Sequence, residues 1–207
     1  MKKKAGKKTK EKEIDNFIYK NLKLGLNFLN ISRNYVFFSF LLFLIMGSIG
    51  FSFPIFFEKE VLKLIQEIVE KTSGLGGLGL IRFIITNNMW SGFVGMILGI
   101  LFGIIPLVVI IVNGYVLGFI AIKTVSLTGG ISILWRLLPH GVFEIPAIMI
   151  SVGLGLKLGS FLFVKHKDYK NDFLDWIKNS LRAFIFVVIP LLVIAGIIEG
   201  LLIVLLG

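Results

Sequence analysis

Residues 93–122 read FVGMILGILFGIIPLVVIIVNGYVLGFIAI and contain no charged side chain. An α-helix rises about 1.5 Å per residue, so one helix of this length exceeds the roughly 30 Å hydrocarbon core of a bilayer. We therefore predict that the stretch either crosses a membrane at a strong tilt or breaks near Pro106, because a proline ring disrupts helical hydrogen bonding. In both cases the stretch indicates an integral membrane protein.

The composition of the whole chain supports the same class. Of 207 residues, 56% are hydrophobic and 16% are charged, whereas soluble domains are about 45–50% apolar and about 25% charged. Residues 35–53 form an uncharged run of membrane-spanning length, and residues 183–207 form the last span. We predict an all-α polytopic membrane helix bundle of about five membrane helices, some of them short, Pro-broken or re-entrant, with amphipathic interfacial helices.

Several kinds of site are excluded by residue counts. The chain has no cysteine and two histidines, His140 and His166. Disulfides, thiolate metal sites and a cysteine nucleophile are therefore ruled out, and one chain cannot supply three histidine ligands. The serines lack a Gly-x-Ser-x-Gly context, and the spacing His-x-x-x-Glu differs from the His-Glu-x-x-His of zinc proteases. We expect no enzymatic activity, no catalytic residue, no metal and no cofactor.

The charges divide the chain into segments. Residues 1–34 hold ten Lys or Arg against three acids, and residues 165–182 hold five against three. A basic excess beside membrane spans marks the cytoplasmic side, so we expect a cytoplasmic N-terminus in a multi-pass protein of the cell membrane. The predicted organisation is a basic tail with an amphipathic helix (1–34) and an integral domain (35–207), which contains an external segment (54–91) and a cytoplasmic loop (165–182).

The basic tail predicts a lipid partner. Lysine runs also bind nucleic acid, but this tail has no interleaved aromatic side chains, so we expect the anionic leaflet and no nucleic acid. Residues 14–31 have apolar side chains near helical spacing, which fits either a helix on the inner membrane surface or a helix packed on the end of the bundle. Residues 58–71 predict a second amphipathic helix, on the external side.

The number of crossings constrains residues 131–164. If residues 1–34 and 165–182 lie on one side, an even number of spans separates them, and residues 35–53 and about 92–113 supply two. Two more spans need about 40 residues and a turn. We therefore expect short, Pro-broken helices in this region, at least one of them re-entrant, around a polar cavity near residues 139–144.

Four polar residues are candidates for an intramembrane site: Asn113, Arg136, His140 and Glu144. Pro139 suits the first position of a helix, and His140 and Glu144 then share one face because they are four residues apart. A glutamate in lipid is costly unless it is paired or hydrated. The group either relays protons, binds a metal or a ligand headgroup, or locks the helices together.

Two further features leave alternatives. Gly92, Gly95, Gly99 and Gly103 form a stripe along which another helix can approach closely, within one chain or between chains. His166 lies in a charged loop, where we expect a solvated surface side chain.

The intramembrane motifs resemble those of the stage II sporulation protein M family. The resemblance rests on the glycine stripe, on Asn113-Gly114-x-x-x-Gly118 and on Leu138-Pro139-His140-Gly141-x-x-Glu144-x-Pro146-Ala147. It implies a polytopic protein of roughly five helices without known catalysis, with signature residues at Asn113, Gly114, Pro139, His140, Gly141 and Glu144. Sporulating members recruit two peptidoglycan-degrading partners into one membrane complex.

Three functional hypotheses follow. The first is a non-enzymatic membrane scaffold that holds other membrane proteins, or further copies of itself, through its helices and the external amphipathic segment. The second is a small transporter or channel subunit whose site comprises the four polar residues named above, because broken helices often meet at such sites. The third is a metal-dependent membrane hydrolase that takes a third ligand from a second subunit.

Overall fold

The computed structural model describes the backbone of residues 2–128 and 131–206 and the side chains of residues 13–127 and 141–203. All elements in this part of the chain are helices, as the composition predicts. They are α1 (Lys2–Ile31), α2 (Arg33–Ser52), α3 (Glu58–Thr72), α4 (Gly77–Ile97) with η1 (Leu98–Ile100), α5 (Ile104–Thr128), α6 (Ile131–Gly159) with η2 (Ser160–Phe163), α7 (Tyr169–Ala183), η3 (Phe184–Val188) and α8 (Ile189–Leu206).

Five helical segments in the described residues are long and apolar enough to cross a membrane, which confirms the predicted polytopic bundle. The last of them is one long helix, because the π-helical turn η3 joins α7 to α8 without interruption. The five segments are Arg33–Ser52, Gly77–Ile100, Ile104–Leu127, Gly141–Phe163 and Tyr169–Ile203.

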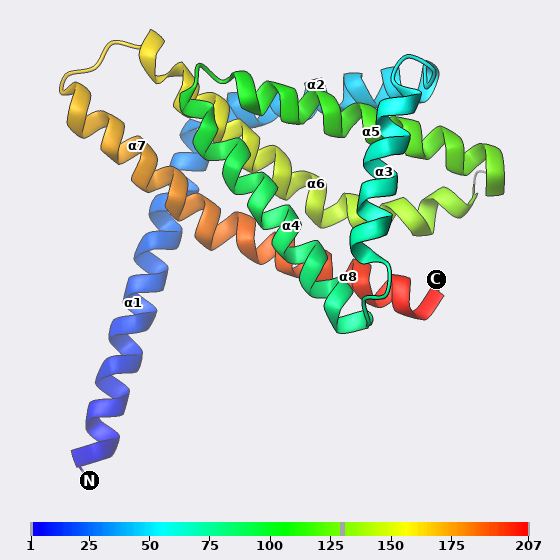
Figure 1. The fold of residues 1–207 in the computed structure, drawn as a ribbon. Helices are drawn as coiled ribbons and strands as arrows, with labels where there is room; N and C mark the ends of the chain where they lie inside the picture. Colours follow the sequence, from blue (N-terminus) through cyan, green and yellow to red (C-terminus); the bar gives the residue numbers. More distant parts are fainter. Residues whose placement is uncertain (1, 129–130, 207) are drawn as a thin grey trace.

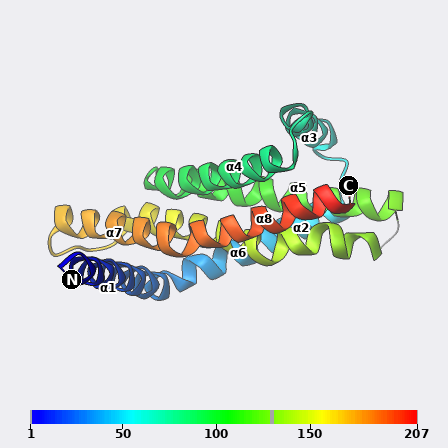
Figure 2. The ribbon, with the colours of Figure 1, turned by 90° about the horizontal axis from the view of Figure 1, so that it is seen from below.

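Helix α6 lies at the centre of the bundle. It packs against α2, α4, α5 and α8 (Figure 1). Helix α2 lies beside α5, and α4 beside α8. Helices α1 and α3 instead run across the bundle direction: both are steep in Figure 1, and α3 is seen nearly end-on after the rotation to Figure 2. The bundle therefore carries one crosswise helix towards each of its two ends.

The stretch 93–122 breaks close to Pro106, which confirms the second of the two alternatives. Helix η1 ends at Ile100 and α5 begins at Ile104. Phe102 and Gly103 between them have positive φ angles of 55° and 72°, a region that favours glycine. Pro106 lies in the first turn of α5, where its missing N–H costs little. One uncharged run thus becomes two antiparallel spans.

The expectation of short, Pro-broken helices in residues 131–164 is wrong. Helix α6 runs unbroken from Ile131 to Gly159, so Pro139 and Pro146 lie inside a helix and neither begins one. Prolines are tolerated inside membrane helices because neighbouring helices and local adjustments satisfy the freed carbonyl groups. The parity argument remains satisfied, since α4 begins at Gly77, within the segment assigned to the external side. In the described residues, four helices of spanning length then lie between residue 32 and residue 165.

Small residues let α6 approach α4 closely. A Cβ atom built on Gly99 would overlap the backbone of Gly155, and one built on Gly159 would lie 2.6 Å from the carbonyl oxygen of Gly99. The hydroxyl of Ser151 donates a 2.6 Å hydrogen bond to the carbonyl oxygen of Gly92. Close approach of this kind is the usual driving interaction between membrane helices. The glycine stripe therefore serves packing within the chain.

The other helix pairs use the same device. A Cβ atom on Gly118 of α5 would overlap the carbonyl oxygen of Gly47 on α2, and one on Gly50 would overlap Tyr115. Between α4 and α8, side chains of α4 cover two glycines of α8. These pairs are Gly196 with Ile85 and Gly200 with Ile81.

Candidate functional site

Glu144 is buried in the centre of the bundle. Its side chain belongs to α6 and the residue is 4% exposed. It lines a small cavity of about 40 Å³ together with Asn113 of α5 and Phe43 of α2. A water molecule needs roughly 10–15 Å³ of such space, so the cavity holds a few waters at most. The remaining lining residues are Leu117, Ile145, Ile148 and Met149.

The structure brings two of the four predicted site residues together, Asn113 and Glu144. The side-chain amide of Asn113 donates a 2.8 Å hydrogen bond to the carbonyl oxygen of Val109, one turn earlier in α5. This bond supplies the partner that an amide in a membrane needs. The side chains of Arg136 and His140, and any pairing they make with Glu144, lie outside the described residues.

The other motif residues have structural roles of different kinds. Gly114 lies under α2, where a Cβ atom would come within 2.7 Å of the carbonyl oxygen of Phe43. Gly141 is less constrained, because a Cβ atom there would meet only the end of Ile145, at 3.5 Å. Pro146 lies one turn further along α6, and the side chain of Pro139 is not among those described.

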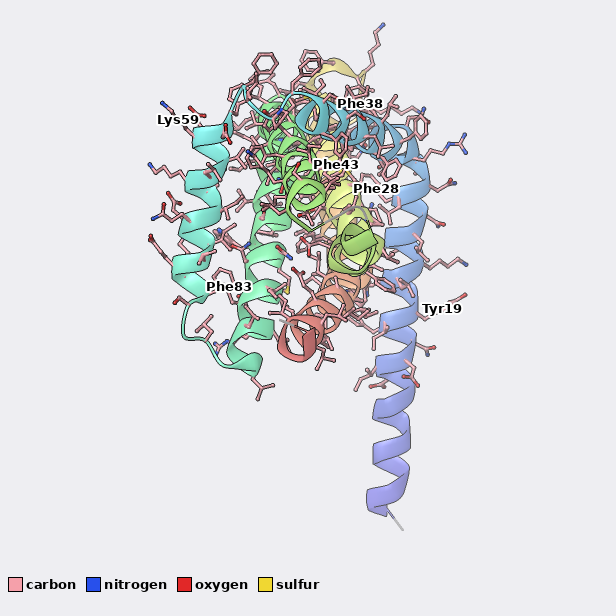
Figure 3. All side chains as sticks on the ribbon, turned by 90° about the vertical axis from the view of Figure 1, so that its right-hand side faces the viewer. Tyr19, Phe28, Phe38, Phe43, Lys59 and Phe83 are labelled. Carbon is pink, nitrogen blue, oxygen red and sulfur yellow. The ribbon has the colours of Figure 1, made fainter. Side chains whose placement is uncertain are left out.

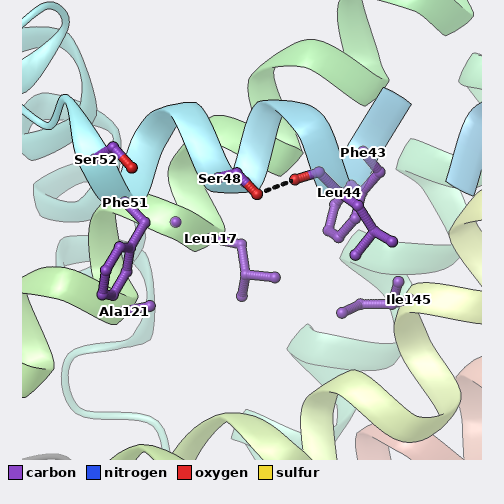
Figure 4. Close-up of a pocket in the computed structure, with 10 residues that line it drawn as sticks. Phe43, Leu44, Ser48, Phe51, Ser52, Leu117, Ala121 and Ile145 are labelled. Carbon is purple, nitrogen blue, oxygen red and sulfur yellow. Dashed lines mark hydrogen bonds between the residues drawn. The ribbon is translucent and has the colours of Figure 1, made fainter. Parts of the chain in front are cut away.

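A larger groove adjoins the Glu144 cavity. It measures about 570 Å³ and lies between α2 and α5, with Ile145 of α6 at one side (Figure 4). Phe43, Leu117 and Ile145 line both the groove and the cavity. These three side chains therefore separate the buried carboxylate from the open groove. The further lining residues are Leu44, Gly47, Ser48, Phe51, Ser52, Gly118 and Ala121.

The chemistry available at this site is that of one buried carboxylic acid and one amide. Within the part of the chain whose side chains are described, no three His, Asp or Glu residues gather as metal ligands would. A buried acid beside a small polar cavity can hold a proton, accept hydrogen bonds from water or lock neighbouring helices.

A second polar cluster, at the end of α6 near η2, was not predicted from the sequence. The ammonium group of Lys157 lies 3.9 Å from the centroid of the Trp176 ring and 5.2 Å from that of Tyr35. The Tyr35 hydroxyl donates a 2.8 Å hydrogen bond to the hydroxyl of Ser160. Cation–π contacts of this kind stabilise a lysine away from bulk water. Tyr35 lies 125 residues before Ser160 in the sequence, and Trp176 lies on a different helix from Lys157, so no local pattern indicates the cluster.

The expectation for His166 is wrong. Its side chain is 6% exposed, and its ring stacks on Phe161 with 3.7 Å between centroids. The Nε2 atom lies 2.8 Å from the carbonyl oxygen of Phe161, and Nδ1 lies 3.5 Å from the Asp172 carboxylate. The loop that holds this histidine folds back on η2 and α7, because aromatic side chains from both surround the imidazole ring.

The loop ends at Asp168, which caps α7. Its carboxylate accepts a 3.2 Å hydrogen bond from the backbone N–H of Asn171 and a 2.6 Å bond from the side-chain amide of the same residue. These bonds, the backbone one first, hold the pKa of the Asp168 carboxyl below its usual value, because they favour the ionised form.

Helix α3 is attached to the bundle at its N-terminal end. The ammonium group of Lys123 on α5 lies 2.6 Å from the Glu58 carboxylate. The Tyr115 hydroxyl donates a 2.8 Å hydrogen bond to the carbonyl oxygen of Phe53, and Val61 is buried against Tyr115 and its neighbours. We use the term α3 face for three exposed apolar side chains of this helix. They are Leu62, Ile68 and Val69, which are 49%, 52% and 58% exposed.

Comparison with known proteins agrees with the intramembrane motifs. The family model described as stage II sporulation protein M matches residues 36–202. An uncharacterized protein of Methanocaldococcus jannaschii, MJ0706, is 38% identical over 108 residues, which are 50% of this chain and 48% of the relative. A second from that organism, MJ0793, is 34% identical over 114 residues, which are 51% of this chain and 64% of the relative. This chain thus spans about half to two thirds of these relatives, and no solved structure matches it.

Proposed function

The chain belongs to the stage II sporulation protein M family, and from this premise we propose that it is a non-enzymatic membrane scaffold that holds partner proteins in the bilayer. The observation that carries the proposal is the α3 face. A fifteen-residue helix is fixed to the bundle by one end and leaves apolar side chains exposed beyond the contact.

The attachment of α3 supports a binding role for the α3 face. The ion pair between Lys123 and Glu58 and the buried Val61 hold the first turn of the helix in position. Because the helix is already ordered and oriented, a partner helix that packs on it does not bear the entropic cost of ordering it. Apolar residues at helical spacing are the usual contacts of such helix-to-helix recognition.

The small size of the Glu144 cavity also supports scaffolding. Glu144 faces a cavity of only about 40 Å³, on a helix that backbone-to-backbone contacts hold against α4. A rigid, tightly packed bundle suits a protein that holds others in place.

The test is co-purification from native membranes. We expect a partner to accompany the native chain and to be lost when Ile68 and Val69 are both replaced by glutamine, which removes the apolar surface and keeps the helix. The matched control replaces Lys63 and Glu67 of the same helix by glutamine and retains the partner. A chain that always migrates alone, or a partner that both double variants retain, contradicts the proposal.

A transporter or channel subunit is the second candidate, and one observation favours it. The carboxyl group of Glu144 is buried in the bundle, and Phe43, Leu117 and Ile145 line both its cavity and the open groove. Movement of those side chains would connect the acid to the groove. Proton flux into proteoliposomes, measured with a trapped pH dye, separates the candidates. Flux that Glu144→Gln abolishes favours transport, whereas no flux above empty vesicles, with partner binding intact, favours the scaffold.

A further inference from the structure

Helix α1 crosses the last span at the point where the apolar sequence begins. A Cβ atom built on Gly25 would lie 3.0 Å from the backbone nitrogen of Ala183. Arg182, the preceding residue, donates a 2.9 Å hydrogen bond from Nε to the side-chain oxygen of Asn21. From Ala183 onwards no charged residue occurs before Glu199. The contact therefore sets α1 at the level of the membrane surface.

The N-terminal half of α1 extends away from the bundle at that level. Figure 1 shows it projecting past α7, and Figure 3 shows the part that carries Tyr19 standing clear of the other helices. Tyr19 is 67% exposed, whereas Phe28 nearer the bundle is 5% exposed. The helix thus has a packed half and a free half.

One apolar face runs through both halves. In the packed half, this face contains Asn21, Gly25 and Phe28, which contact α7 and its neighbours. The same face continues towards the N-terminus through Phe17 and Ile14, at spacings of four and three residues. In the free half these side chains are exposed, by 57% for Ile14 and 63% for Phe17. The face that buries apolar area against the bundle therefore continues where no described element covers it.

The positive charge of the free half indicates an anionic binding partner. Residues 2–20 contain eight lysines and three acids, and Lys20 is exposed. A helix that combines an apolar face with an excess of lysine binds best at the boundary of an anionic leaflet, where both features are satisfied. A protein partner or a second copy would match the apolar face, but a second copy would place two lysine-rich segments together.

We propose that residues 13–20 of α1 dock on the bilayer surface at this end of the bundle, with Ile14 and Phe17 among the acyl chains and with anionic headgroups attracted by Lys20 and by the lysine-rich sequence that precedes residue 13. The packed half anchors the helix to the last span, and the free half lies along the leaflet. The proposal selects between the two alternatives for residues 14–31: the second half packs on the bundle, and the first half lies on the membrane. It does not depend on the scaffold function.

The test uses the full chain, which has no cysteine of its own. Single-cysteine variants Phe17→Cys, on the apolar face, and Asn16→Cys, on the opposite side, are labelled with a spin probe. Each is reconstituted into vesicles of phosphatidylcholine with or without phosphatidylglycerol. Collision rates with oxygen, which concentrates in lipid, and with a water-soluble nickel chelate report the depth of the probe.

We expect the Phe17 probe to be lipid-exposed with phosphatidylglycerol and to shift towards water without it or at about 1 M salt, where screening shortens to about 3 Å. The Asn16 probe is expected to stay water-accessible throughout. A water-accessible Phe17 probe in both vesicles overturns the proposal. So does a Phe17 probe buried equally in both, since charge then plays no part. Spin–spin broadening that disappears on dilution with unlabelled chain also overturns it and indicates a second copy.

Discussion

Replacing Gly155 by alanine tests whether the glycine stripes serve packing within the chain. Gly155 lies where α6 meets α4 and the start of α5. A Cβ atom there would come within 2.5 Å of the carbonyl oxygen of Gly95 and 2.8 Å of the Pro106 ring. Real Cβ atoms essentially never approach heavy atoms this closely, and one of these neighbours is backbone. The substitution therefore requires two membrane helices to move apart.

The expected loss of stability follows from two opposing effects. Overpacking in a well-packed interior costs about 1–3 kcal/mol, and alanine recovers up to about 1 kcal/mol of helix propensity. Since the contact is with backbone, the upper part of the range applies and the net loss is about 1–2 kcal/mol. For a chain of this size, 1 kcal/mol corresponds to about 2–4 °C in Tm. We expect Gly155→Ala to lower Tm by about 2–8 °C.

The measurement is thermal unfolding in one detergent at one scan rate, followed by tryptophan fluorescence. Gly141→Ala is the matched control on the same helix, because its Cβ atom would meet only Ile145 at 3.5 Å. The control is expected to unfold at the native temperature or slightly above it. Equal Tm values for both variants, or a changed oligomeric mass with an unchanged Tm for Gly155→Ala, would refute packing within the chain.

Three further predictions concern single contacts. Lys123→Ala breaks a half-exposed ion pair with Glu58, so Tm should fall by the equivalent of 1 kcal/mol or less; the loss should vanish at high salt and should not add to that of Glu58→Ala. Ser151→Ala removes the bond to Gly92 and should cost about 0.5–2 kcal/mol, and a native Tm would contradict the interhelical bond. The pKa of Asp168 is lower in the folded chain than the ordinary carboxyl value of 3.8. The cap therefore stabilises α7 fully at pH values above 3.8, and this stabilisation is lost as the pH falls through the lower pKa of the folded chain. The protection of the amides in the first turn of α7, taken relative to the intrinsic exchange rate at the same pH, should therefore fall in acid, but not in Asp168→Asn, which retains a capping side chain. Identical losses of protection in both chains would refute the assignment.

The membrane spans followed from local properties of the sequence. An uncharged run of about 20 residues is unstable in water and stable in lipid whatever its neighbours are. The break near Pro106 was one of two alternatives that the sequence left open, and the structure decided it by placing Phe102 and Gly103 at positive φ angles. The burial of Glu144 was predicted because lipid rejects a lone carboxylate.

The wrong prediction for residues 131–164 arose because its prolines were interpreted without the helices that pack against them. Two prolines and several glycines between residues 131 and 164 suggested broken helices, yet α6 is continuous. In a bundle, the small residues Gly155 and Gly159 bring neighbouring helices close enough to hold α6 together. The prediction that His166 lies on the surface failed for a similar reason. The aromatic rings that bury it come from two different helical segments, which the sequence around His166 does not indicate.

The amino-acid sequence by itself determined that this chain is a bundle of membrane helices with a lysine-rich end, because transfer into lipid and attraction to a charged surface depend on local composition. Tertiary structure alone decided which helices meet, that the glycine stripes face inward, that Lys157 rests on Trp176, and that α1 is half packed and half free. Those outcomes depend on contacts between residues far apart in the chain, and the free energy of such contacts comes from complementary shape, which no local pattern of residues encodes.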